Sequence, residues 1–84
     1  MTHLIVEQTF STPLTDAEHD RAAKRLNPCL EQHGAHWVRS YLSQDRLRMV
    51  CEFEAADAEA VRSSYRSAGM PFDRVWATEV YARA

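Results

Sequence analysis

Three histidines and one glutamate are the residues of this chain best suited to hold a metal ion. They are His3, His33, His36 and Glu54. Imidazole is the nitrogen ligand that nickel, zinc and copper favour, and a carboxylate commonly fills a remaining position. If the fold gathers these side chains, they predict a site for nickel or another divalent transition metal. The alternative is that His33 and His36 only satisfy carbonyl groups at a helix end beside Gly34, while His3 is solvated.

A second group could bind a small organic molecule. It consists of Glu7, Trp37, Tyr41 and Glu52. Two carboxylates enclosed between subunits could act as acid or base on a ligand, with the tyrosine as a hydrogen-bond donor. The alternative is that these carboxylates form ordinary cross-strand pairs with neighbouring arginines such as Arg39. For Trp37, the alternative is that it is a packing residue.

Cys51 is the most conspicuous potential nucleophile. It alternates with Leu47, Met49 and Phe53, which predicts that it points into the core. Since the sequence places no histidine to activate it, we interpret Cys51 as a core residue.

The elements that must position these residues follow from periodicity and cap signals. Residues 3–10 alternate as a strand, with Leu4, Val6, Gln8 and Phe10 on the core face. A capping box of Thr15 and Glu18 opens a helix that reaches Gly34, with a kink or a restart expected at Asn27-Pro28.

Two strand-like runs within residues 36–55 form a hairpin around a polar turn at 43–45. Asp57 caps a second helix, which ends at Gly69, and residues 72–81 form a last strand. The order is βαββαβ, so we predict one α+β, ferredoxin-like domain over residues 1–84, with a four-stranded antiparallel sheet and two helices on one face.

Right-handed crossovers place the first strand between the third and the fourth, with the second strand at the edge beside the third. The sheet face without helices should then carry Trp37 and Tyr41 beside the charged residues Glu7, Arg39 and Glu52. Exposed aromatic residues on such a face favour a homodimer, in which two open faces enclose a barrel. The same topology should bring His3, His33, His36, Glu54 and Tyr81 to one end of the sheet.

Charge and composition narrow the class of partner. Ten basic and twelve acidic residues give a net charge of −2, and the basic residues are dispersed along the chain. This pattern argues against nucleic acid or a membrane as the partner. The amino-terminal residues lack the pattern of a signal peptide, so we expect a cytoplasmic protein with free thiols at Cys29 and Cys51. With two glycines, the chain also has no phosphate-binding loop.

Three stretches of sequence resemble a known family: WVRSYLSQD (37–45), VCEFEAADAEAVR (50–62) and AGMPFDRV (68–75). The family consists of small bacterial single-domain proteins of unknown function that are described in part as nickel-binding. The resemblance runs from Val6-Glu7 to the last strand. The matching positions are Glu7, Trp37, Ser40, Tyr41, Cys51, Glu54, Arg62, Gly69 and Pro71.

This resemblance implies a ferredoxin-like fold, a dimeric α+β barrel and a metal site. One departure bears on the metal. Many similar sequences carry histidine in the second helix, two residues after Arg62, where this chain has Ser64. If that histidine binds the metal, this protein has lost the ligand or uses another one.

Three functions compete. The first is a small homodimeric metal-binding protein of the nickel type. The second is a dimeric α+β barrel enzyme or carrier, of the isomerase or cofactor-free oxygenase kind, that binds a small organic molecule between the open sheet faces. The third is a dimeric scaffold. Fold alone does not choose among them.

Overall fold

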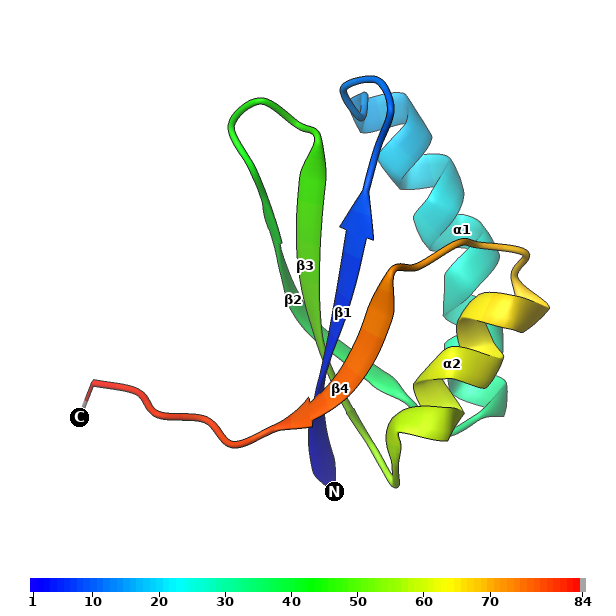
Figure 1. Cartoon of the computed structure of the whole chain (residues 1–84). Coiled ribbons are helices and arrows are strands. Elements are labelled where there is room, and N and C mark those ends of the chain that lie inside the picture. The colour runs from blue at the N-terminus through cyan, green and yellow to red at the C-terminus, as the bar shows by residue number, and fades with distance from the viewer. Residues whose placement is uncertain (84) are drawn as a thin grey trace.

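A computed structural model describes residues 1–83 and shows one sheet with two helices on one side (Figure 1). The elements run β1 (Thr2–Thr9), α1 (Asp16–Gln32), β2 (His36–Leu42), β3 (Arg48–Ala55), α2 (Ala58–Ser67) and β4 (Arg74–Thr78). The predicted βαββαβ order is thereby confirmed.

The sheet is antiparallel, with strand order β2-β3-β1-β4. β1 is therefore central, between β3 and β4, and β2 lies at the edge, as the crossover rule predicts. Both helices cover the same face, and the other face has no covering element among residues 1–83 (Figure 1). We call this uncovered side the open face.

Both helices begin with a side-chain cap. Thr15 accepts a hydrogen bond from the Glu18 backbone N–H, and Glu18 accepts one from the Thr15 N–H, which completes the predicted capping box. Asp57 Oδ1 accepts from the Ala60 N–H at 2.9 Å and caps α2.

Both helices also end alike, in a Schellman motif whose glycine has a φ of +67°. After α1, the Ala35 N–H donates to Leu30 O and the Gly34 N–H to Glu31 O. After α2, the Met70 N–H donates to Tyr65 O and the Gly69 N–H to Arg66 O. The left-handed backbone explains why these two positions are glycine.

The core lies between the helices and the inner faces of the central strands. Leu4, Val6, Phe53 and Val61 are almost completely buried there, and Tyr65 packs edge-to-face against Phe53 with ring centroids 6.0 Å apart. The predicted core faces of the first and third strands are confirmed: Gln8, Met49 and Cys51 are buried with this group.

α1 continues through Pro28, so of the two alternatives expected at Asn27-Pro28 the restart does not occur. One predicted boundary is wrong. β4 ends at Thr78 rather than at residue 81, and the chain then leaves the sheet (Figure 1). As a consequence Tyr81 is 91% exposed and does not join the end of the sheet where we expected it. Within residues 1–83, no helix combines the length and apolar character needed to cross a membrane.

Candidate functional site

The strand register assigns the polar side chains of the open face to three rows. Residues directly opposite one another in an antiparallel sheet point to the same face. The first row, from β2 to β4, is Tyr41, Val50, Glu7 and Arg74; the second is Arg39, Glu52, Ile5 and Trp76; the third is His36, Glu54, His3 and Thr78. Charged and aromatic residues thus share this face, which lies on the side of the sheet opposite the helices.

His3 is the centre of the most compact polar group on this face. Its Nε2 lies 3.3 Å from Glu52 Oε2, and its Nδ1 lies 4.0 Å from Glu54 Oε1. Glu52 is held from the other side by Arg39, whose Nε lies 3.5 Å from Glu52 Oε1. A single imidazole therefore has a carboxylate beside each of its ring nitrogens, and imidazole nitrogen and carboxylate oxygen are both donors that divalent transition metals accept.

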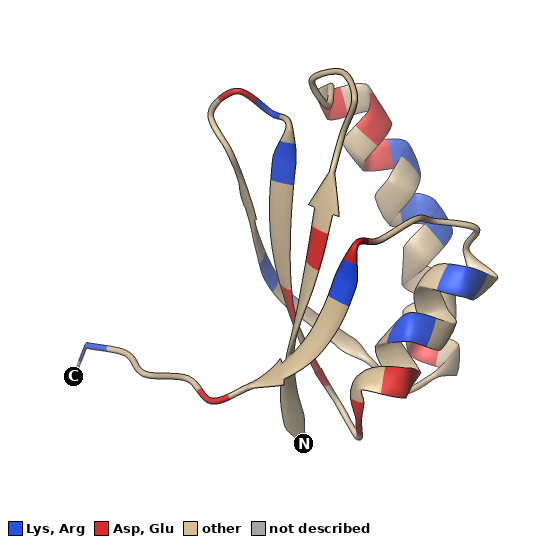
Figure 2. Cartoon of the chain, in the orientation of Figure 1, with Lys and Arg blue, Asp and Glu red and all other residues tan. Residues whose placement is uncertain are grey.

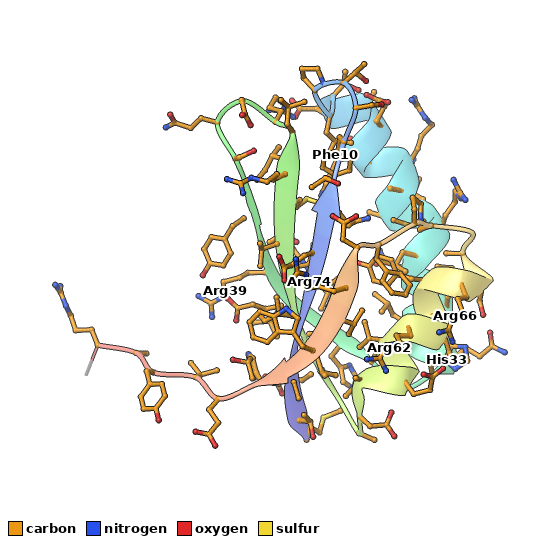
Figure 3. All side chains as sticks on the ribbon, in the orientation of Figure 1. Phe10, His33, Arg39, Arg62, Arg66 and Arg74 are labelled. Atoms are coloured by element: carbon orange, nitrogen blue, oxygen red, sulfur yellow. The ribbon has the colours of Figure 1, made fainter. Side chains whose placement is uncertain are left out.

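The predicted metal ligands are only partly brought together. His36 pairs with Glu54 in the strand register, so it shares a row with His3. His33 caps the C-terminus of α1 and lies in the helix layer, whereas Arg39 and Arg74 mark the opposite side of the sheet (Figure 3). The expectation for His33 is therefore wrong, because topology fixes which end of the sheet a residue approaches but not its layer. Within residues 1–83, no three His, Cys, Asp or Glu side chains are arranged to hold a metal ion.

Glu7 has two partners, both on the edge strand β4. Trp76 Nε1 donates to Glu7 Oε2 at 2.7 Å, and Arg74 Nε lies 3.3 Å from the same oxygen. The ion pair agrees with the alternative interpretation that carboxylates on this face form cross-strand pairs. The mixed apolar and polar pattern of the last strand does not indicate that Trp76 lies on the open face beside Glu7.

Tyr41 and Glu7 line a shared hollow of about 380 Å³ at the end of the sheet near the hairpin turn. Arg48 and Asp73 also line it. Glu52 and Trp37 are not among its lining residues, so the four predicted ligand-binding residues do not form one pocket in a single chain.

Trp37 is not on the open face, which corrects our expectation. Trp37 pairs with Phe53, whereas Arg39 pairs with Glu52, so Val38 is an extra residue in the register. This β-bulge reverses the alternation of side chains at the start of β2. Trp37 consequently lies on the helix side of the sheet, where it lines a cavity with Phe53.

On that side, a chain of hydrogen bonds connects Trp37 to Cys51. The Trp37 indole N–H donates to Ser40 Oγ at 2.9 Å, and the Ser40 hydroxyl donates to Cys51 Sγ at 3.0 Å. Burial raises the pKa of the Cys51 thiol, more than the Ser40 and Tyr65 hydroxyls lower it. A thiol that stays protonated is a poor nucleophile, in agreement with a core position.

Ser64, the position at which the resemblance raised the question of a histidine ligand, lies in the interface between the helices. It is fully buried, and its hydroxyl donates to Ala60 O at 2.8 Å and lies 3.3 Å from Cys29 O. It is therefore on the other side of the sheet from His3. The serine at this position does not remove a ligand from the open face.

Charges of both signs are mixed over the sheet and the helices (Figure 2). On the open face, Arg39 and Arg74 pair with Glu52 and Glu7 rather than forming a basic surface of their own.

Comparison with known proteins gives two findings. Residues 4–78 match the model of a family described as nickel responsive protein SCO4226-like. The fold is also similar to that in the crystal structure of SCO4226 from Streptomyces coelicolor A3(2), with a TM-score of 0.84 and 18% sequence identity. That similarity covers 95% of this chain and 99% of the other. No curated protein matches the chain significantly.

Proposed function

Because this chain belongs to the SCO4226-like family of nickel responsive proteins, we propose that it is a small homodimer that binds a divalent transition metal on the open face of its sheet. The observation that carries this proposal is the pairing of His3 with Glu52. The family suggests nickel as the first metal to examine, since nickel is the metal in its description.

The chemistry and the spacing of this pair both suit one metal ion. Two donors that each bind an ion at roughly 2.1 Å, at right-angled to tetrahedral geometry, lie about 3.0–3.4 Å apart. His3 Nε2 and Glu52 Oε2 are 3.3 Å apart. Arg39 occupies the other carboxylate oxygen, so it would orient Glu52 Oε2 toward the imidazole and the ion.

One copy of the chain supplies too few ligands. Glu54 lies near the other ring nitrogen, Nδ1, so without rearrangement it cannot join Nε2 at one ion. A two-fold dimer presents the same patch twice, and two copies of His3 and Glu52 would offer four donors. Such a site would be complete only between two open faces, while Glu54 and His36 in the adjacent row could supply further donors.

Exposed aromatic residues on the open face support the dimer. Tyr41 is 56% exposed and Trp76 is 42% exposed on this face. Residues 79–83 extend away from the helices toward the same side, and they include the exposed Val80 and Tyr81 (Figure 1). A second copy would cover apolar surface that a small monomer leaves in water.

A thermal-unfolding titration with Ni²⁺ tests the metal. The protein should be purified without an affinity tag and stripped with a chelator. When the concentration of free metal is about 100 times its Kd for the folded state, binding should stabilise the protein by about 2.7 kcal/mol. His3→Gln should abolish the rise in Tm, and the matched control His33→Gln should retain it, because His33 lies in the helix layer. Equal loss of the effect in both variants, or none in the wild type, contradicts the proposed site.

The hollow lined by Glu7 and Tyr41 favours a second candidate function. Its acidic and phenolic groups could bind a small organic molecule in an enzyme or carrier built on the same dimer. Native mass spectrometry distinguishes the two candidates. Retained nickel supports the first, and a retained organic mass that Glu7→Gln releases supports the second.

A further inference from the structure

A second cavity lies on the helix side of the sheet, separate from the open face. It measures about 190 Å³ and is bounded by α1 and by the inner faces of β2 and β3. Its walls include Leu26, Leu30, Phe53 and Tyr65, which are all buried, and Trp37 lies among its lining residues while being 57% exposed. The cavity is therefore apolar inside and has an aromatic side chain at its solvent side.

One buried polar atom in the wall has no hydrogen-bond partner among the described residues. Gln8 is 6% exposed and lines this cavity, and it also borders the hollow lined by Glu7 and Tyr41. Its Nε2 donates to Pro71 O at 3.0 Å, which fixes the orientation of the amide, and its Oε1 is left unsatisfied. A buried acceptor without a donor is costly in a folded protein, so a ligand that supplies the donor would be favoured.

The other polar groups of the cavity limit the charge of a ligand. Burial raises the pKa of the Cys51 thiol and of the Tyr65 hydroxyl, so both are neutral near neutral pH. Among residues 1–83, no Lys, Arg, Asp or Glu lines the cavity, and His19 is the one histidine there. A charged ligand would lose its hydration without gaining an ionic partner inside.

Size gives the last constraint. An engineered protein cavity of about 150 Å³ lined by apolar side chains binds benzene. The cavity described here, at about 190 Å³, has room for one aromatic ring and a small substituent. We propose that it binds a neutral, single-ring aromatic molecule with one hydroxyl or amino group, which donates a hydrogen bond to Gln8 Oε1. This proposal does not depend on the metal site or on the dimer.

Two-dimensional ¹H–¹⁵N NMR of the whole protein tests the proposal, with phenol as the probe, toluene as the analogue without a donor and benzoate as the charged analogue. Phenol should shift the indole signal of Trp37 and the side-chain amide signal of Gln8 in a saturable manner. The indole of Trp76 is an internal control, because it lies on the open face and should not move. Benzoate should leave the signals of Trp37 and Gln8 unchanged.

Two variants then separate the hydrogen bond from simple filling of space. Gln8→Leu should lower the affinity for phenol by about tenfold, since it removes the hydrogen-bond acceptor. The affinity for toluene should stay unchanged or rise. Ala23→Leu, on the cavity wall, should lower the affinity for both compounds, because the larger side chain occupies part of the cavity. This second variant keeps the test decisive if Gln8→Leu unfolds through loss of its bond to Pro71.

Three results would overturn the proposal. The first is the absence of saturable shifts with phenol up to its solubility limit. The second is an equal response of Trp37 and Trp76, which would indicate binding to exposed rings. The third is an equal loss of affinity for phenol and for toluene in a folded Gln8→Leu protein, which would show that Gln8 Oε1 accepts no hydrogen bond from the ligand.

Discussion

His3 Nε2 lies 3.3 Å from Glu52 Oε2, and Arg39 Nε contacts the other oxygen of the same carboxylate at 3.5 Å. This arrangement leaves one glutamate oxygen beside the imidazole and one beside the guanidinium. It indicates that Arg39 positions Glu52, and it gives a first prediction about a residue that would not itself contact a metal.

Arg39→Met should lower the affinity for Ni²⁺ by about tenfold, because residues that orient metal ligands typically contribute that much or more. Isothermal titration calorimetry measures the change. Arg74→Met is the matched control, since Arg74 pairs with Glu7 on the same face and should not affect the metal. A similar loss in both variants would point to the overall charge of the face instead.

Tyr41→Glu should shift the protein from dimer to monomer, because it places a charge on the open face where the second copy would pack. Sedimentation velocity measures the molecular mass. Trp37→Glu is the matched control: Trp37 and Tyr41 are 57% and 56% exposed, but Trp37 lies on the helix side. If Trp37→Glu dissociates the dimer and Tyr41→Glu does not, the two copies meet through a different surface.

Cys51 should resist alkylation in the folded protein. Burial raises its pKa, so the reactive thiolate becomes abundant only at a pH above the range of an ordinary cysteine. With iodoacetamide at about pH 8, peptide mass spectrometry should find Cys29, which is half-buried, modified first. Denaturant should make the two rates similar. Rapid modification of Cys51 in the native protein would contradict the buried position.

Thr15→Ala should destabilise the protein by about 1 kcal/mol, because it removes the side-chain cap of α1. For a domain of this size the expected fall in Tm is about 4–8 °C. Serine at this position should restore most of the loss, since its hydroxyl can accept the same bond.

The capping box also makes a prediction about pH. Hydrogen bonds from the Thr15 backbone and side chain lower the pKa of Glu18. A lowered folded-state pKa contributes stability that is present above the unfolded-state pKa and is lost as the pH falls through the folded-state pKa. Wild type should therefore exceed Glu18→Gln in stability near neutral pH, and chemical denaturation should show the difference disappearing in acid.

Ser64→His should destabilise this chain by about 1–3 kcal/mol, because it inserts a ring at a fully buried contact between the helices. The exposed Ser67 on the same helix supplies the control, since Ser67→His should change stability by less than about 0.5 kcal/mol. Urea denaturation measures both. If Ser64→His is neutral, the space between α1 and α2 accommodates the histidine of similar sequences without other changes.

The fold was predictable because local signals agree with one another. Capping residues, two glycines at helix ends and alternation in β1 and β3 each mark a boundary or a face without reference to distant residues. The strand order then follows from the handedness of crossovers. The end of β4 was not predictable in the same way, since apolar and polar residues continue past Thr78 with no turn signal.

The candidate site was predictable only in part, for a physical reason. His3 and Glu54 were expected to meet because β1 begins at the end of the sheet where β3 finishes, and the register places them opposite each other. The prediction for His33 was wrong because a helix and a strand can end at the same edge of the sheet while lying in different layers. The prediction that Trp37 lies on the open face was wrong because one extra residue in β2 reverses the alternation of its side chains. No pattern of side chains in the sequence reveals which residue leaves the hydrogen-bond ladder.

The extra residue at Val38 also bears on whether the edge of the sheet can pair with another strand. β2 is an edge strand, and an edge with free backbone groups can pair with further chains and grow into a fibre. A bulge twists such an edge and interrupts its ladder, so another strand cannot align along it. The dimer proposed through the open face would leave the β2 edge uncovered, and this irregular segment of β2 disfavours the addition of further strands there.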